Sequence, residues 1–473
     1  MISVQRLNFV LWLLLSVSFL GETVRGENID AEEVDRFCYP DLLRNSRLSC
    51  ECSSVNAAPW GMRALHIDCS YKDYKSKDLS ELLPLYIDSL DLSWNTLDLV
   101  PQFSSDTLRQ LNLMHNNISG ITSNNFAQLG SLQELHLSWN SIQWLAAQAF
   151  ANLPHLQVLD LGHNNLQVLP AQIFAPLLVL TTLDLAWNRQ LNQTVELQAK
   201  DWYNSYGINN KLGTLRLDAC NLSTLVLPTA APLKHLSLRR NRFTRVPPQL
   251  PATLQQLDMS DNLLEILLPT DLGNLTQLQQ LTMEDMPVLE SIAANALQSL
   301  DMLEVVSLQN SRRLSSINDV AFGSNKSYWP PLRRLIFRGT MLRTFNATLY
   351  PLFAQLDELD LNGLPLHCYC ELVWLKDLTI ETNGRCYKPS SVRGMLVSSV
   401  RRDYFKCDSW PRWLYGLMVL GLISLMAAGA YLVVMGLRPH RGVTMRRKVG
   451  AGSPYARVTI EPNRQENNFS AVD

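Results

Sequence analysis

A six-residue pattern recurs along this chain and constrains its fold more than any other feature. Nearly the same letters occur three times, as LDLSWN at 90–95, LHLSWN at 135–140 and LDLAWN at 183–188. Aligned on the last residue, the pattern extends to about twelve units, whose key positions are Asn95, Asn116, Asn140, Asn164, Asn188, Cys220, Asn241, Asn262, Met286, Ser311, Thr340 and Leu364. These positions are 21 to 32 residues apart. A period of this length indicates one repeated supersecondary unit rather than separate domains.

The letters of the unit predict a stacked solenoid. The spacing LxxLxLxxNxL is the signature of a leucine-rich repeat. Alternate leucines of a short strand point inward. Stacked strands would therefore form a curved horseshoe of the α/β class, with a parallel sheet on its concave face. The asparagine lies where the chain leaves the strand, and its amide can bond backbone groups of neighbouring turns. We expect residues 85–366 to form one continuous array.

Two apolar segments lie outside the array. Residues 7–20 follow Arg6 and are too short to span a bilayer, which is typical of a secretory signal. We place its cleavage after Gly26, the alternative being an uncleaved anchor. Residues 413–437 are 25 residues without a charge, about 37 Å of helix, enough to cross a membrane. A cleaved signal sends the preceding residues out of the cytosol, and a basic cluster follows the span. Because basic residues also precede the span, the orientation rests mainly on the signal. Together they predict a cytoplasmic tail, 438–473, and a type I single-pass protein of the plasma membrane with its N-terminus outside.

This topology divides the chain and its charge. The expected parts are a signal peptide 1–26, an N-terminal cysteine cap 27–84, repeats 85–366, a C-terminal cysteine cap and juxtamembrane stalk 367–412, a transmembrane helix 413–437 and a tail 438–473. The outer part, 27–412, holds 32 Lys and Arg against 39 Asp and Glu, a net charge of −7, while the tail is +4. A mildly acidic ectodomain argues against a nucleic-acid partner, and a basic tail suits an anionic inner leaflet.

Eight of the nine cysteines flank the array in two quartets. An exported solenoid needs modules that cover its apolar ends, and disulfides persist outside the cell. We expect two disulfides in each quartet, Cys38, Cys50, Cys52 and Cys69 before the repeats and Cys368, Cys370, Cys386 and Cys407 after them. Spacing alone leaves three pairings open in each. Zinc is the alternative for the C-x-C clusters, and the secretory setting disfavours it. The ninth, Cys220, stands at an asparagine position and is interpreted as a buried thiol.

The C-terminal quartet also supports a family resemblance. The segment PLHCYCELVWLKDL at 365–378, with Cys386 and Cys407 beyond it, resembles the C-terminal cap of animal extracellular leucine-rich-repeat proteins. These include Toll-like receptors, Slit and single-pass neuronal adhesion proteins. The resemblance implies the pairs Cys368–Cys386 and Cys370–Cys407, and ligand binding by protein contact.

The resemblance covers residues 38–407, but the N-terminal quartet departs from the family pattern. Cys38 lies twelve residues before Cys50, and Cys69 seventeen after Cys52, both wider than usual. The pairing of this quartet therefore stays open.

Two columns of residues are candidate ligand-binding surfaces. Just before the asparagine, five successive units carry a ring, namely Trp94, His115, Trp139, His163 and Trp187. These rings are either a ligand-binding stripe or, as is ordinary at this position, rings packed on their neighbours. Between the two leucines, outward residues line the concave sheet, the usual ligand face. Of these we single out His136, Asp160, Asp184 and Arg216, although polar residues are the default on a solvated strand. The polar insertion 193–211 is either a recognition loop or a tolerated excursion.

Further motifs predict modification. Sequons at Asn117, Asn192, Asn221, Asn274, Asn325 and Asn346 predict a glycosylated outer surface. In the tail, YARV at 455–458 has the form of a tyrosine-based sorting signal, and phosphorylation of Tyr455 is the alternative.

The sequence lacks catalytic signatures. It contains no G-x-S-x-G, H-E-x-x-H, P-loop or G-x-G-x-x-G motif. His115 and His163 would lie about 9–10 Å apart, too far to share a metal. We therefore expect no catalysis, cofactor or metal.

Function is inferred from the large array and the tail of 36 residues, which is too short for a kinase or Toll-type signalling domain. We expect a non-enzymatic cell-surface protein that binds an extracellular protein ligand or another surface protein, in cell adhesion or cell–cell recognition. The alternative is a receptor, co-receptor or decoy for an immune or growth signal, acting through a partner. A co-receptor or a second copy of the chain would be its partner in the membrane.

Overall fold

The leucine-rich units form the turns of one solenoid in the computed structural model. The structure describes residues 50–56, 63–79, 87–191, 202–323, 329–405, 407 and 412–436. The chain divides into two compact units, Met1–Cys407 and Asp408–Asp473. The predicted signal peptide, Cys38, and the tail with Tyr455 lie outside the described residues.

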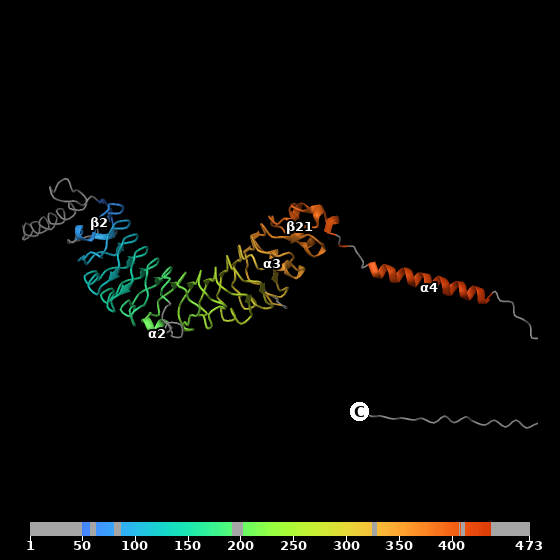
Figure 1. Cartoon of the computed structure of the whole chain (residues 1–473), viewed down its shortest axis with the longest axis horizontal. Coiled ribbons are helices and arrows are strands. Elements are labelled where there is room, and N and C mark those ends of the chain that lie inside the picture. The colour runs from blue at the N-terminus through green and yellow to red at the C-terminus, as the bar shows by residue number, and fades with distance from the viewer. Residues whose placement is uncertain are drawn as a thin grey trace, which may run out of the picture. The chain divides into compact units, whose positions relative to one another are not determined.

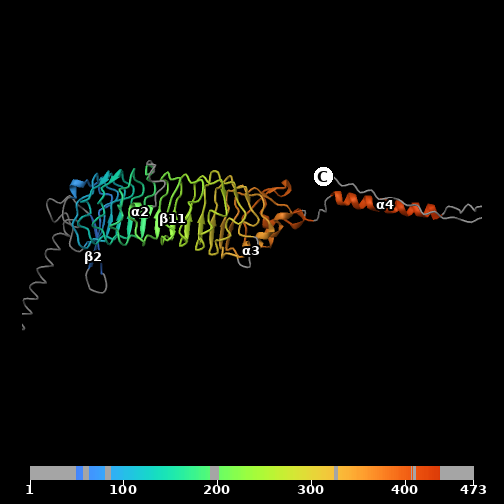
Figure 2. The ribbon, with the colours of Figure 1, turned by 90° about the horizontal axis from the view of Figure 1, so that it is seen from below.

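Fourteen strands of the described residues join in one sheet, and all but the first pair are parallel. In sheet order they are β1 (Glu51–Asn56), β2 (Arg63–Asp68), β3 (Ile87–Asp91), β4 (Gln110–Asn112), β6 (Glu134–His136), β8 (Val158–Asp160), β9 (Thr182–Asp184), β10 (Thr214–Arg216), β11 (His235–Ser237), β12 (Gln256–Asp258), β14 (Gln280–Thr282), β16 (Val305–Ser307), β18 (Arg334–Ile336) and β19 (Glu358–Asp360). Leucines in equivalent positions pair along the sheet, as Leu135 does with Leu111 and Leu159. All twelve predicted units are present, and β2 begins a thirteenth turn before them. Figure 2 shows the turns side by side.

Short strands also form on the flanks of some turns. They are β5 (Gly120–Ile121) with β7 (Trp144–Leu145), β13 (Ile266–Leu267) with β15 (Ser291–Ile292) and β17 (Ser316–Ile317), and β20 (Leu366–His367) with β21 (Cys386–Lys388). Each group is parallel and links turns that also pair in the main sheet or in the C-terminal cap.

The solenoid curves because neighbouring turns are spaced differently on its two sides. Hydrogen-bonded strands lie about 4.8 Å apart. On the opposite side each of three turns buries a phenylalanine, and the ring centroids of Phe126, Phe150 and Phe174 are 6.3 and 6.4 Å apart. The wider side bends the stack toward the sheet, which therefore lines the concave face as predicted. Figure 1 shows the resulting arc.

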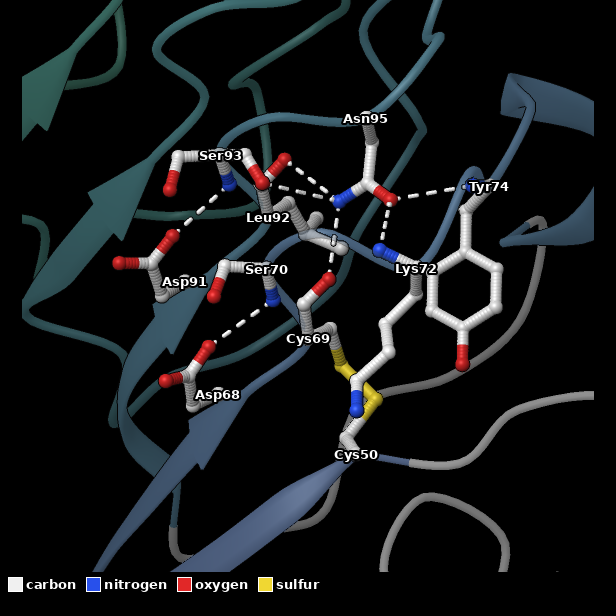
Figure 3. Close-up of a disulfide and its surroundings, with 10 residues drawn as sticks. All are labelled: Cys50, Asp68, Cys69, Ser70, Lys72, Tyr74, Asp91, Leu92, Ser93 and Asn95. Atoms are coloured by element: carbon white, nitrogen blue, oxygen red, sulfur yellow. Dashed lines mark hydrogen bonds between the residues drawn. A yellow bond between two sulfur atoms is a disulfide. The ribbon is translucent and has the colours of Figure 1, made fainter.

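The asparagine amides connect the turns. The side-chain Nδ2 of Asn95 donates to the carbonyls of Leu92 and Ser93 in its own turn, at 2.9 and 3.2 Å, and to that of Cys69 in the preceding turn at 2.8 Å. Its Oδ1 accepts from the backbone amides of Lys72 and Tyr74. Figure 3 shows this network. Buried backbone groups left open where the strand ends are thus satisfied by one side chain.

We call the row of inter-turn bonds that begins at Asn95 the asparagine ladder, and the residue that makes them in each turn the ladder position. Six more asparagines continue it, and other residues occupy the remaining ladder positions. Asn116, Asn140, Asn164, Asn188, Asn241 and Asn262 make the equivalent bonds. At Ser311 a hydroxyl substitutes, donating to the Met283 carbonyl at 3.2 Å. Cys220 is a buried free thiol, with its Sγ 3.2 Å from the Leu185 carbonyl oxygen, as predicted. Burial raises its pKa to about 12.

Disulfides close both ends of the solenoid. At the N-terminal end Cys50 pairs with Cys69, joining β1 to the turn after β2 (Figure 3). Cys52 is also disulfide-bonded. At the C-terminal end the pairs are Cys368–Cys386 and Cys370–Cys407, the pairs that the resemblance implies.

Helices are few in the described residues. Besides 3-10 turns such as Cys370–Asp377, they are α2 (Trp202–Tyr206), α3 (Tyr350–Phe353) and α4 (Arg412–Gly436). In the described part of the chain, α4 is the one helix long and apolar enough to cross a membrane, over Gly416–Val433.

The insertion before Cys220 packs into the solenoid through α2. Its three aromatic side chains, Trp202, Tyr203 and Tyr206, are buried. The amide of Phe174 donates to the Tyr206 carbonyl at 2.9 Å, which fixes the helix against the preceding turn. The buried rings leave no exposed aromatic side chain in the described part of the insertion, which favours a tolerated excursion over a recognition loop.

Loss of one ladder amide should weaken the solenoid strongly. Asn164→Ala removes three donated bonds and leaves the buried amide of Ile142 without its acceptor. Each buried group left unsatisfied costs about 1–3 kcal/mol. We expect the free energy of unfolding to fall by about 3 kcal/mol, measured by urea denaturation.

The matched control is Asn165→Ala, the exposed neighbour in the same turn, which should change the unfolding free energy by about 0.5 kcal/mol or less. Equal effects of the two substitutions would contradict the role given to the ladder.

Candidate recognition surfaces

The backbone explains why rings form a column. In thirteen successive turns the residue just before the ladder position has a positive φ, namely Tyr71, Trp94, His115, Trp139, His163, Trp187, Ala219, Arg240, Asp261, Asp285, Asn310, Gly339 and Gly363. This left-handed conformation lets the chain reverse directly after the strand. It is unfavourable for bulky side chains and is tolerated best by Gly, Asn and Asp. The last five turns follow that preference, with Asp261, Asp285, Asn310, Gly339 and Gly363, but the first six carry rings.

These six rings, Tyr71, Trp94, His115, Trp139, His163 and Trp187, are called the ring column. Neighbouring rings stack nearly parallel, with interplanar angles of 10–14°. From Tyr71 onward the centroid distances are 5.2, 3.6, 5.1, 3.7 and 4.9 Å. The rings therefore cover each other's faces and leave their edges to solvent. Tyr71, Trp94 and Trp139 are 70%, 46% and 48% exposed.

Stacking offsets the backbone cost. An aromatic pair contributes about 0.5–1.5 kcal/mol beyond the area it buries, whereas a left-handed residue with a side chain costs about 1–2 kcal/mol. The rings pack on their neighbours, as one of the two interpretations predicts. Binding of a ligand along their exposed edge stays a prediction. Burial within the column lowers the pKa of His115 and of His163.

Cations close the C-terminal end of the ring column. The guanidinium carbons of Arg189 and Arg240 lie 5.2 and 5.0 Å from the centroid of the Trp187 ring. The next position along, Ala219, carries no ring and leaves room for Arg240 to reach back. A hollow of about 360 Å³ beside this end is lined by Trp139, His163, Trp187 and Arg189, among others.

The candidate residues on the concave face also make hydrogen bonds and ion pairs within the solenoid. Asp160 and Asp184 each accept, through Oδ1, the backbone amide two residues later, at 2.9 and 2.8 Å. Arg216 lies 3.3 Å from the Asp184 carboxylate, and His136 lies 3.5 Å from that of Glu134. The two predicted carboxylates therefore stabilise the turn that follows the strand, which is a structural role.

A shallow hollow of about 330 Å³ lies over β10, β11, β12 and β14 on the sheet. Arg216 lines it together with His235, Asp258 and Thr282. Of the concave residues predicted as candidates, Arg216 belongs to this hollow, whereas His136 and Asp160 lie on earlier strands.

The sequence pattern missed two features. Tyr71 extends the ring column into the N-terminal cap, where the leucine motif is absent; its distance of 23 residues from Trp94 was the available signal. A flank cavity beside Trp144 had no signal in the motif.

The sequons differ in their surroundings. Asn117, Asn274 and Asn346 are exposed, Asn221 is half-buried, and Asn192 and Asn325 lie outside the described residues. Their glycosylation stays a prediction.

Comparisons with known proteins agree with this geometry. Two family models match, one described as "Leucine rich repeat" at 135–189 and 231–285 and one as "Leucine Rich Repeat" at 107–129. The chain therefore contains leucine-rich repeats in these segments. The matched segments carry the same ladder asparagines and strand leucines that build the sheet.

Relatives among curated proteins match over parts of the chain. Rat leucine-rich repeat and fibronectin type III domain-containing protein 1 is 27% identical over 221 residues, 46% of this chain and 24% of that protein. Mouse leucine-rich repeat transmembrane protein FLRT2 is 27% identical over 242 residues, 42% of this chain and 35% of that protein. Human chondroadherin-like protein is 31% identical over 64 residues, 13% of this chain and 8% of that protein. The chain thus spans about a third or less of these relatives.

A solved structure of the Toll–Spatzle complex of Drosophila superposes with a TM-score of 0.43 at 19% identity, covering 70% of this chain and 56% of that chain. The superposition is too loose to add to what the repeats establish.

Asp184 should make stability depend on pH. Burial raises its pKa to about 6, above the ordinary value of 3.8, and Arg216 opposes the shift only in part. A carboxyl group with a raised folded-state pKa disfavours folding once it ionises, so the penalty grows as pH rises from about 4 to 6 and is complete above that. Asp184→Asn removes it. We expect wild type to lose about 2 kcal/mol relative to the variant between pH 4 and pH 7.

Urea unfolding of both proteins at the two pH values measures this difference. Asparagine preserves the turn, because Asn112 stands at the equivalent position and its Oδ1 accepts the Met114 amide at 3.0 Å. A difference between wild type and variant that does not change with pH would contradict the shifted pKa.

Proposed function

We propose that this chain is a non-enzymatic cell-surface protein whose solenoid binds a partner protein in cell adhesion or cell–cell recognition. It is held in the plasma membrane by α4 with the solenoid outside. Three disulfides among the described residues support an exported solenoid, since disulfides persist in oxidising compartments. The length and apolar character of α4 support the anchor. One of the relatives is named a transmembrane protein.

The ring column carries the proposal. Six rings occupy backbone positions that disfavour them, in the first six turns, and present a continuous exposed edge. Tryptophan and tyrosine are enriched among the residues that dominate binding at protein interfaces. Their flat, rigid side chains lose little conformational entropy on binding. Stability alone does not require rings here, because Asp, Asn or Gly serves the same position in later turns.

The column also has polar and charged surroundings suited to a protein partner. Arg189 and Arg240 stand at one end, and the partly exposed carboxylates of the concave strands lie on the adjoining face. An aromatic centre with a polar rim is the usual anatomy of a protein interface. We assign the partner to the ring column and the neighbouring concave edge.

Cell clustering tests the proposal with the full chain. Cells that express it should cluster with one another or with cells bearing one partner. The triple variant Trp94→Asn, Trp139→Asn and Trp187→Asn should reduce clustering about thirtyfold or more, because loss of even one dominant contact costs about 2 kcal/mol. Asparagine tolerates positive φ, so the variant should reach the surface at the same level, measured by antibody staining.

The matched control is Asp285→Asn with Asn310→Gly, which alters the same backbone column where it has no rings and keeps residues that tolerate a positive φ. This control should cluster as wild type does. Clustering that survives the triple variant would remove the ring column from the proposal. If cells never cluster but capture a secreted protein, the adhesion role fails and the chain is a receptor, co-receptor or decoy for a soluble ligand.

A further inference from the structure

A cavity of about 860 Å³ opens on the flank of the first four turns. Its walls come from the segments that follow the ladder position in each turn and include Lys75, Thr96, Leu99, Gln102, Ser119 and Trp144. Two apolar side chains in it are unusually open, Leu99 at 57% and Trp144 at 51% exposed. It lies apart from the ring column, whose residues precede the ladder position.

The Trp144 ring is fixed as one wall of the cavity. Trp144 in β7 pairs with Gly120 in β5, and the amide of Gln143 donates to the Ser119 carbonyl at 3.0 Å. A Cβ on Gly120 would lie 2.3 Å from the Trp144 ring. The indole therefore rests directly on the glycine backbone, and the missing side chain of Gly120 helps to open the space.

The last residue of a sequon lies at the rim of this cavity. Asn117, Ile118 and Ser119 form the motif, the side chain of Asn117 is exposed, and Ser119 belongs to the cavity wall. Thr96 directly follows the ladder position of the preceding turn, as Asn117 does in its own turn, and Thr96 also lines the cavity. A group attached to the exposed Asn117 amide would begin two residues before Ser119 of the cavity wall.

We propose that the cavity holds the first two N-acetylglucosamine units of an N-linked glycan on Asn117, with one sugar face against Trp144. This inference rests on the proposed function, since the chain must enter the secretory pathway. There Nδ2 of Asn117 displaces the lipid diphosphate from C1 of the donor oligosaccharide, forming the N–C bond and losing one amide proton.

The chemistry of the walls fits this occupant. A pyranose ring presents C–H groups on its faces and hydroxyl groups at its edge, so it needs a flat apolar surface beside polar groups. Trp144 and Leu99 supply the apolar surface, while Lys75, Gln102 and Thr122 supply polar side chains for hydroxyl and acetamide groups. Attachment at the rim gives the sugar a high effective concentration, so even weak stacking suffices to fill the cavity.

Docking would also direct the glycan. From Asn117 the cavity lies onward along the turn, whereas His115 of the ring column lies before it. A glycan held against Trp144 leads away from the exposed ring edges and leaves them open to a partner.

The test compares rates of enzymatic release of the glycan from native full-length protein made in cultured cells. Peptide-N-glycosidase must reach the Asn117 linkage, which docking shields. Release at Asn117 should be about tenfold slower than at the exposed Asn274, because the accessible fraction scales the rate. Trp144→Ala should bring the two rates together. Trp144→Leu keeps an apolar side chain without the flat face and should also speed release, which covers the case that Trp144→Ala fails to fold.

The matched control is Val168→Ala, an exposed residue 24 positions after Trp144 and outside the cavity walls, which should leave both rates unchanged. Equal rates at Asn117 in wild type and in both Trp144 variants overturn the inference. So does mass spectrometry that finds a glycan on Asn274 but none on Asn117. If neither residue carries a glycan, the proposed export fails and the inference fails with it.

Discussion

Seven turns of this solenoid each depend on one asparagine amide that bonds backbone groups in two turns at once. Asn164, for example, donates to carbonyls of its own turn and to the Leu137 carbonyl of the turn before it, and accepts the amide of Ile142. To bring the amide into this position the chain must reverse directly after the strand, and the preceding residue takes a left-handed conformation. The same geometry repeats at strand spacing, so any side chains placed at that position are brought into contact. The ring column follows from this repeated reversal of the chain, which the turns without a ladder asparagine share.

Much of the fold could be predicted because a repeat array is governed by contacts between neighbours. The leucines that alternate in each strand and the asparagine that ends it are local in sequence, and they specify the sheet, its parallel order and its concave placement. Five members of the ring column were visible at a fixed offset from the asparagine. The pairing of the C-terminal cysteines came from a family resemblance instead, because spacing alone leaves three choices.

What could not be predicted depends on contacts that the motif does not encode. The Trp144 indole takes its place in the cavity wall because Gly120, 24 residues earlier, has no side chain beneath it, and neither residue is part of the repeat motif. The insertion is polar in composition, yet its three aromatic side chains are buried and the Tyr206 carbonyl bonds to the turn that holds Phe174. Asp160 and Asp184 were correctly placed on the concave face, but their use as acceptors for the turn required coordinates.

The row of residues just before the ladder position, which includes the ring column, also has a direction. It begins with the exposed phenol of Tyr71, two residues after Cys69 of the N-terminal disulfide. It then passes through alternating indoles and imidazoles and ends at the guanidinium groups over Trp187. Beyond that point the same edge is lined by small or acidic residues and finally by two glycines, Gly339 and Gly363. The two ends of this edge are therefore chemically different. If two such molecules met through their ring edges, head-to-head and head-to-tail alignments would make different contacts.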